Sequence, residues 1–323
     1  MKLTLVLIMA ITSAQAAGWL LVANKGDHTL GIVDPASGTE IAVVPEGGIT
    51  GHEVIASPDG RTAYVPIYGN SGVGKPGTDG SEIVAIDLAA HKVTNTLHFD
   101  HGVRPHCPLF GPKDGMLYVT TELDHTISVI DPKSFKVIAT IPTTQPESHM
   151  LVISHDGRRG YTANVGPGTV SVLDMRAHKT LAVIPISKET QRISITPDDK
   201  LVFTSDQTKP QLAVIDTATD KIAHWVALPD TGYGTAATAD GRYLLVAVPK
   251  AGKVSVVDLK SFEVVKNVDV PKAPQEVLIR PDGKAAYVSC DASAKIAEIS
   301  IGDWKVEKLI SAGKSADGLA WAK

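Results

Sequence analysis

The chain has 323 residues, of which 43% are hydrophobic but only 5% aromatic, and its formal net charge at pH 7 is -4. A chain without a basic excess lacks the electrostatic footprint of a nucleic-acid-binding protein, so we expect no nucleic-acid partner. The many small and β-branched residues fit the interior of stacked β-sheets.

The first residues predict export. Lys2, the apolar run 3–11 and the small residues Ala14-Gln15-Ala16 form the pattern of a secretory signal peptide. We therefore expect residues 1–16 to be removed after Ala16, and residues 17–323 to form a single periplasmic or secreted domain. The apolar run is shorter than the ~20 residues that a membrane-spanning helix needs, and no later stretch is longer, so no membrane span is predicted.

The rest of the chain repeats one unit of four short strands. Its clearest copy, residues 149–184, has runs of Val, Ile and Leu separated by Asp-Gly and Pro-Gly turns, which is typical of an antiparallel meander. The copies recur roughly every 42 residues, a period found in β-propeller blades. In most copies the third strand ends in an aspartate that we expect to cap the following turn. These residues are Asp34, Asp87, Asp131, Asp174, Asp216 and Asp258, with Ser300 in the last copy.

Seven copies predict an all-β, seven-bladed propeller with four antiparallel strands per blade. Neither end of the chain holds a complete blade, because residues 19–24 resemble a second strand and residues 318–322 a first strand. We expect these two segments to pair and close the ring, which removes two exposed strand edges.

The two cysteines, Cys107 and Cys290, fall in the second and sixth complete blades. Those blades lie across the ring from each other, whereas a disulfide needs Cα atoms within ~7 Å. We therefore expect both thiols to be free despite export.

The first complete blade contains a long insertion, residues 66–80, between its second and third strands. Part of it, residues 69–76, resembles a phosphate-binding loop, but proline follows the lysine where such a loop has Ser or Thr. Strands rather than a helix also flank it. We interpret the insertion as a flexible glycine-rich loop that shapes a binding face.

One column of the repeat is polar throughout. It stands at the start of the innermost strand of each blade, where Val, Ile, Leu and Ala otherwise follow. Its members are His52, His106, His149, Gln191, Tyr233, Gln275 and Asp317. In a propeller these strand starts surround one mouth of the central channel. The column therefore predicts a binding site at that mouth, with the four members after the histidines as ligand-binding candidates.

The three histidines of this column, His52, His106 and His149, belong to consecutive blades. Three imidazoles held by rigid strands can bind copper or zinc with metal–nitrogen distances of about 2.0–2.1 Å and leave one coordination position open. The alternative is a wet channel mouth in which the histidines bind only water and neighbouring carbonyls. In both cases we expect these side chains to face solvent.

The repeats resemble those of the YVTN-type propellers of exported bacterial proteins. The resemblance is carried by SPDGRTAYV (57–65), GYTANVGPGTVSVLD (160–174) and KVSVVDLKSFEVVKNVDV (253–270), and it extends over nearly the whole mature chain. It implies the propeller fold rather than one function, because such propellers include binding proteins and surface-layer proteins.

A narrower similarity is to the lactonase and carboxymuconate-cyclising seven-bladed propellers. His52 matches the histidine before one blade's turn in those proteins, and Glu122-Leu123 matches the end of a second strand in the next blade. Those proteins have a Pro-Arg-His segment at the start of this blade. The corresponding segment here is Arg104-Pro105-His106, so His106 occupies the position of their arginine. The resemblance implies that His52 or His106 is a general acid and base, with Glu122 as its partner or as a second proton-transfer group. It also implies that Arg104 holds a substrate carboxylate.

Three functions are compatible with these patterns. The first is a periplasmic propeller that binds a small molecule or a metal ion, copper or zinc, at the channel mouth. The second is a lactonase-like hydrolase or cycloisomerase, and the third is a protein-interaction scaffold that uses its rim without catalysis. Whether the protein is an enzyme stays open. The sequence has no haem, nucleotide or flavin signature and no nucleophile elbow, and we expect a monomer.

Overall fold

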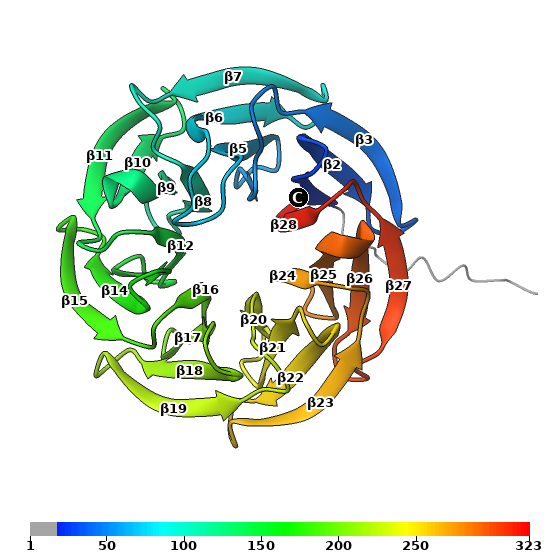
Figure 1. Cartoon of the computed structure of the whole chain (residues 1–323). Coiled ribbons are helices and arrows are strands. Elements are labelled where there is room, and N and C mark those ends of the chain that lie inside the picture. The colour runs from blue at the N-terminus through cyan, green and yellow to red at the C-terminus, as the bar shows by residue number, and fades with distance from the viewer. Residues whose placement is uncertain (1–17) are drawn as a thin grey trace, which may run out of the picture.

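A computed structural model describes residues 18–323 and shows a ring of seven four-stranded sheets arranged around a central axis (Figure 1). Each sheet is antiparallel, and its strands follow one another from the channel outward. The predicted seven-bladed propeller is therefore confirmed. The predicted signal peptide lies outside the described residues.

Six blades are built from consecutive strands. The first three, from the channel outward, are β4(Ile55–Ala56), β5(Thr62–Gly69), β6(Asp79–Asp87) and β7(Lys92–His98); β8(Pro105–Phe110), β9(Leu117–Thr121), β10(Thr126–Asp131) and β11(Lys136–Pro142); and β12(Ser148–Ile153), β13(Arg159–Asn164), β14(Thr169–Asp174) and β15(Lys179–Pro185). The next three are β16(Thr190–Ile195), β17(Leu201–Asp206), β18(Gln211–Asp216) and β19(Lys221–Ala227); β20(Thr235–Ala237), β21(Tyr243–Val248), β22(Lys253–Asp258) and β23(Glu263–Asp269); and β24(Pro274–Ile279), β25(Ala285–Cys290), β26(Lys295–Ser300) and β27(Val306–Ser311).

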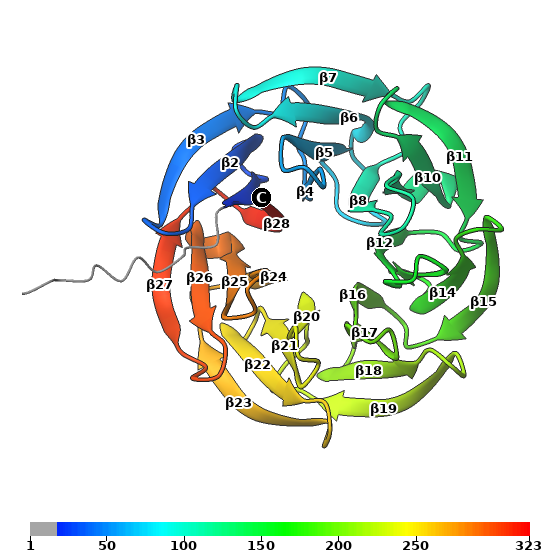
Figure 2. The ribbon, with the colours of Figure 1, turned by 180° about the vertical axis from the view of Figure 1, so that it is seen from behind.

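The seventh blade joins the two ends of the chain. Its strands, from the channel outward, are β28(Ala316–Ala322), β1(Trp19–Asn24), β2(Thr29–Asp34) and β3(Thr39–Pro45). The pairing is antiparallel, with Leu20 opposite Trp321 and Val22 opposite Leu319. Figure 2 shows the red C-terminal strand beside the blue N-terminal strands. The predicted closure of the ring is confirmed.

The burial of each strand follows from its place in the blade. The two middle strands are covered on both faces by neighbouring blades, so β10 and β14 have four consecutive buried residues. The outermost strands are more exposed, and β15 alternates exposed and half-buried positions over most of its length. This difference explains why the second and third strands of each repeat are apolar runs whereas the fourth is mixed.

The aspartates at the ends of the third strands cap turns as predicted. Asp34 Oδ1 accepts a hydrogen bond from the backbone N–H of Ala36 at 2.9 Å, and Asp258 Oδ1 accepts one from Lys260 at 2.8 Å. These bonds fix the turn to the outermost strand, and they lower the pKa of Asp258.

Both cysteines are free, as expected, and both are buried. Burial raises the pKa of Cys107 and of Cys290 to about 12. The helical residues that the structure describes form two short turns, η1(Glu122–Asp124) and η2(Asp291–Ser293), and no helix within residues 18–323 could cross a membrane.

Candidate functional site

The polar column lies at one end of the innermost strands. His106, His149, Gln191, Gln275 and Asp317 stand near the starts of β8, β12, β16, β24 and β28, while His52 and Tyr233 stand shortly before β4 and β20. Antiparallel pairing places the ends of the second strands at the same mouth, so that Ser148 faces Asn164 and Thr190 faces Asp206. Residues that follow a second strand therefore join the column at this mouth.

Several innermost strands contain a β-bulge at this position. The register of β12 shifts between Ser148 and Met150, which leaves His149 out of the ladder. The register of β16 shifts between Gln191 and Ile193, which leaves out Arg192, and the φ of Arg192 is 56°. A bulge redirects a side chain that regular pairing would hold in the sheet face. It therefore gives His149 and Arg192 orientations that a regular strand would not give.

His52, His106 and His149, here called the histidine cluster, lie together, and His106 contacts each of the other two. The ring centroids of His106 and His149 are 3.6 Å apart, with 33° between the ring planes. The rings of His52 and His106 are 5.5 Å apart and nearly perpendicular, and Tyr68 lies 4.7 Å from His52. Three consecutive blades and the end of β5 therefore build one aromatic and polar cluster.

The histidine cluster is more buried than the sequence predicted. His106 is 2% exposed and His149 is 4% exposed, and His52 is half-buried. The expectation that these side chains face solvent is wrong for His106 and His149. Loss of solvation lowers the pKa of all three, to about 3 for His52 and well below the usual value for His106. All three imidazoles are therefore neutral at pH 7.

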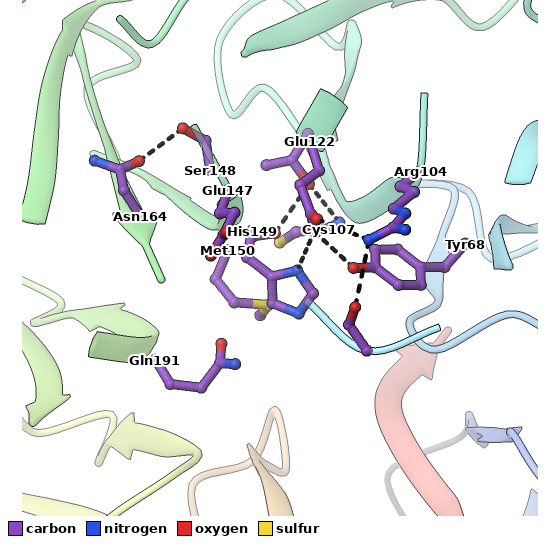
Figure 3. A network of polar contacts seen from close by, with 12 residues as sticks. Tyr68, Arg104, Cys107, Glu122, Glu147, Ser148, His149, Met150, Asn164 and Gln191 are labelled. Atoms are coloured by element: carbon purple, nitrogen blue, oxygen red, sulfur yellow. Dashed lines mark hydrogen bonds and ion pairs between the residues drawn. The ribbon is translucent and has the colours of Figure 1, made fainter. Parts of the chain in front are cut away.

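Glu122 is the buried carboxylate of the site. Its Oε2 atom lies 3.1 Å from His149 Nδ1 and accepts a hydrogen bond from the hydroxyl of Tyr68 at 2.7 Å (Figure 3). Burial alone would raise the pKa of Glu122, but these two bonds and the charge of Arg104 lower it, so the group is an anion at pH 7. The sequence comparison implied His52 or His106 as its partner, whereas the structure pairs it with His149.

Arg104 connects the site to the glycine-rich insertion. Its Nε donates to Asp79 Oδ1 at 2.6 Å, and its terminal nitrogens donate to the carbonyls of Gly72 at 3.3 Å and Lys75 at 2.7 Å. Its Nη1 also lies 3.5 Å from Glu122 Oε1. The guanidinium expected to hold a substrate carboxylate is thus bound by the chain's own loop.

Within residues 18–323, His106 Nδ1 and Glu122 Oε1 are buried without a hydrogen-bond partner. Buried polar atoms without partners are uncommon, and each leaves a hydrogen-bonding or metal-ligating position unused. The side chains do not already form a metal centre, because no group of three or more His, Cys, Asp or Glu residues within 18–323 is arranged to hold a metal ion.

Arg192 makes a second charged network beside the histidine cluster, one that the sequence analysis missed. Its guanidinium donates to Glu53, to Glu276 Oε2 at 2.6 Å and to Asp317 Oδ1 at 2.9 Å, and lies 5.0 Å from the ring centroid of Tyr233. These residues come from five blades, so the side chain of Arg192 crosses the channel. Burial raises the pKa of Glu53 and the charge of Arg192 opposes that rise, whereas the carboxylates hold the pKa of Arg192 well above its usual value.

The signal for this network was present in the sequence. Glu53, Arg192 and Glu276 each directly follow a member of the polar column, at a position where an innermost strand is otherwise apolar or small. Charged residues there predict a second polar layer. Lys25 was also missed. It directly follows β1, and its Nζ donates to Asp317 Oδ2 at 3.1 Å.

Comparisons with known proteins support the fold. Residues 226–323 match the model of the YNCE-like β-propeller family, and residues 112–231 match that of the cytochrome D1 heme domain. No protein of curated function matched the sequence significantly.

Many solved structures are similar to this chain, and two of them illustrate the likeness over most of its length. A functionally unknown protein from Desulfotomaculum acetoxidans DSM 771 is 13% identical with a TM-score of 0.77, covering 95% of this chain and 99% of that chain. Hydrazine synthase from Kuenenia stuttgartiensis is 16% identical with a TM-score of 0.70, covering 85% and 90%. At these identities the likeness is one of fold. The chain is a seven-bladed β-propeller, as its repeats predicted, and its last blades resemble the YNCE-like propellers.

Proposed function

We propose that this protein is an exported binding propeller, and that the histidine cluster at its channel mouth binds a small ligand. A single copper or zinc ion is the ligand that the donor set suits best. The observation that carries this proposal is the contact of three neutral imidazoles, one of which, His106, has a buried Nδ1 without a partner. Only the neutral form of imidazole binds a metal, and the lowered pKa of all three rings keeps that form available.

The partner of His149 also supports a metal ligand. Metal-binding histidines usually give their second ring nitrogen to a carboxylate, which fixes the tautomer and makes the ligating nitrogen more basic. Glu122 occupies that position beside His149 Nδ1. His149 Nε2 would then be the ligating atom. Because the rings of His106 and His149 lie tilted against each other with their centroids 3.6 Å apart, binding requires at least one of them to rotate toward a common point.

The haem named in one of the matching family models does not fit the cluster. The rings of His106 and His149 contact each other, and His52 contacts both His106 and Tyr68, so no macrocycle can lie between them. The matching segment, residues 112–231, contains His149 but neither of the other two histidines. We therefore assign no haem to this site.

The proposal is tested by titrating the tag-free mature protein with Cu(II) and Zn(II) in a calorimeter. We expect one ion per chain and a loss of affinity of at least about 100-fold in His52→Ala, His106→Ala and His149→Ala. His178→Asn is the matched control, because His178 lies on a turn with φ of 50°, a conformation that asparagine tolerates. Unchanged binding in all three alanine variants would refute the proposed ligand set.

A second function, that of a lactonase-like enzyme, is favoured by one observation. The hydrogen bond between Glu122 and His149 is the arrangement that orients a general base, and Tyr68 adds a hydroxyl to the same carboxylate. In that case His149, rather than His52 or His106, would move the proton. Lactone hydrolysis that is present in the metal-free protein and lost in Glu122→Gln would support the enzyme; a metal-free protein without turnover would argue against it. If the protein neither binds a metal nor turns over lactones, the remaining function is a protein-interaction scaffold that uses the rim of the propeller.

A further inference from the structure

The tip of the glycine-rich insertion reaches from the first complete blade to the third. Residues 70–78, here called the lid loop, connect β5 to β6. A Cβ built on Gly74 of this loop would lie 2.6 Å from Glu147 Oε1. Glu147 directly precedes β12, which carries His149, and it also binds the backbone N–H of Gly166 through Oε2 at 2.7 Å. The lid loop therefore spans the second blade, which carries His106.

The lid loop has an ordered internal structure. Asn70 Oδ1 accepts the N–H of Thr78 at 2.7 Å, the N–H of Asn70 donates to the carbonyl of Thr78 at 3.2 Å, and the N–H of Lys75 donates to the carbonyl of Gly72 at 3.0 Å. A loop closed by its own bonds moves as one body about its two ends. Its contacts with the rest of the protein then decide where it rests.

The main polar contact of the loop is with Arg104. This guanidinium is 5% exposed and donates to two loop carbonyls, those of Gly72 and Lys75, and to Asp79 at the start of β6. Arg104 itself precedes β8, so the bonds join the first and second blades. Charge-assisted bonds of a buried guanidinium are among the stronger contacts available to a loop.

The same guanidinium touches the histidine site. Arg104 Nη1 lies 3.5 Å from Glu122 Oε1, an atom with no hydrogen-bond partner, while Glu122 Oε2 binds His149 and Tyr68 (Figure 3). A movement of Arg104 toward Glu122 would fill the empty position on Oε1. It would also weaken the hold of Arg104 on the loop.

We infer that the lid loop is a movable cover over the histidine cluster and that Arg104 is its latch. In the closed state Arg104 holds the carbonyls of Gly72 and Lys75, and the cover contributes to the burial of His106 and His149. Access of a ligand requires these two bonds to break, and the released guanidinium can then bind Glu122. The inference rests on the proposed function only in that the histidine cluster is the site being covered.

Chemical labelling of the histidines tests the cover without using a metal. Diethyl pyrocarbonate modifies neutral, accessible imidazoles, and mass spectrometry gives the rate at each residue. In the wild type we expect His106 and His149 to react at least ten times more slowly than the exposed His91. In Arg104→Gln we expect both to react at least ten times faster than in the wild type, with His91 unchanged. Lys75→Ala is the control, because its carbonyl rather than its side chain binds Arg104.

A second variant removes the cover itself. Replacing residues 70–78 with Asn-Gly joins Gly69 to Asp79, which already face each other in the β5–β6 ladder, through a two-residue hairpin turn. If this variant melts cooperatively and its His106 and His149 still label as slowly as in the wild type, the blades alone bury the cluster and the inference is wrong. Fast labelling of both histidines in the wild type would also overturn it. Because no metal is present, failure of the metal proposal leaves these results unaffected.

Discussion

Arg192, in the fourth complete blade, donates a hydrogen bond to Asp317 of the closing blade across the central channel, at 2.9 Å. The same guanidinium binds Glu53 and Glu276. One side chain therefore joins residues that lie in, or just before, the innermost strands of several blades. The ring is therefore held by contacts through its centre as well as by contacts between neighbouring blades. The charges are buried, and each depends on the others for compensation.

The first prediction concerns this central network. Within the described residues, Arg192 is the only cation that forms ion pairs with Glu53 and Glu276. Arg192→Met therefore leaves these buried carboxyl groups without a positive partner. We expect a loss of about 3–5 kcal/mol in the free energy of unfolding, measured by urea denaturation. Arg158→Met is the control, because the Arg158–Asp156 pair is exposed and should contribute less than about 1 kcal/mol. Equal effects of the two substitutions would show that the central network is not structural.

The second prediction concerns the strand pairing that closes the ring. Deletion of residues 315–323 removes β28, the innermost strand of the closing blade, and exposes the edge of β1. We expect the truncated protein to lose its cooperative unfolding transition in circular dichroism. Removal of Lys323 alone, which lies beyond β28 and is exposed, should change stability by no more than about 0.5 kcal/mol. A truncated protein that melts like the wild type would contradict this account of closure.

The third prediction concerns the pH dependence of stability. Glu46 is fully buried and accepts one backbone hydrogen bond, from Gly51, and burial raises its pKa to about 7. Between the ordinary pKa of 4.5 and about 7, the unfolded chain is ionised while the folded chain keeps its proton. The contribution of Glu46 to stability should therefore fall as pH rises through this range, by on the order of 3 kcal/mol.

Glu46→Gln tests this directly, since glutamine stays neutral at every pH. Relative to the wild type, the variant should gain stability steadily as pH increases from 4.5 to 7, and the difference should level off above that range. Melting temperatures measured at several pH values give the comparison. A constant difference across the range would mean that Glu46 is ionised in the folded protein.

The fourth prediction concerns the thiols. Cys107 and Cys290 are free and buried, and their pKa values of about 12 keep them protonated. A thiol reagent should therefore react slowly with the native protein and should count two thiols per chain after unfolding without reductant. Addition of reductant should leave the melting temperature unchanged. A count of zero would indicate a disulfide.

The repeat was enough to predict the blades, their number, the closure of the ring and the state of the cysteines, because each depends on spacing along the chain. The contacts and the burial of the residues at the channel mouth were harder to predict. Arg192 and His149 owe their directions to bulges, and a bulge has no signature in a pattern of apolar residues. The burial of His106 and His149 was also missed, because a polar column at the starts of the innermost strands does not tell how closely its side chains pack together.

The pairing of β1 with β28 also sets an order of events. β1 is the first strand of the described chain to be synthesised and β28 is the last, so the blade that they share cannot be completed until β28 has been made. Contacts between such distant segments form slowly, because a long loop must close before they contribute. Until then the unfinished ring is an open arc, and the free edge of β1 can accept a strand from another molecule. Between the synthesis of Trp19 and that of Ala322, the edge of β1 that β28 later covers is therefore open to pairing with another chain.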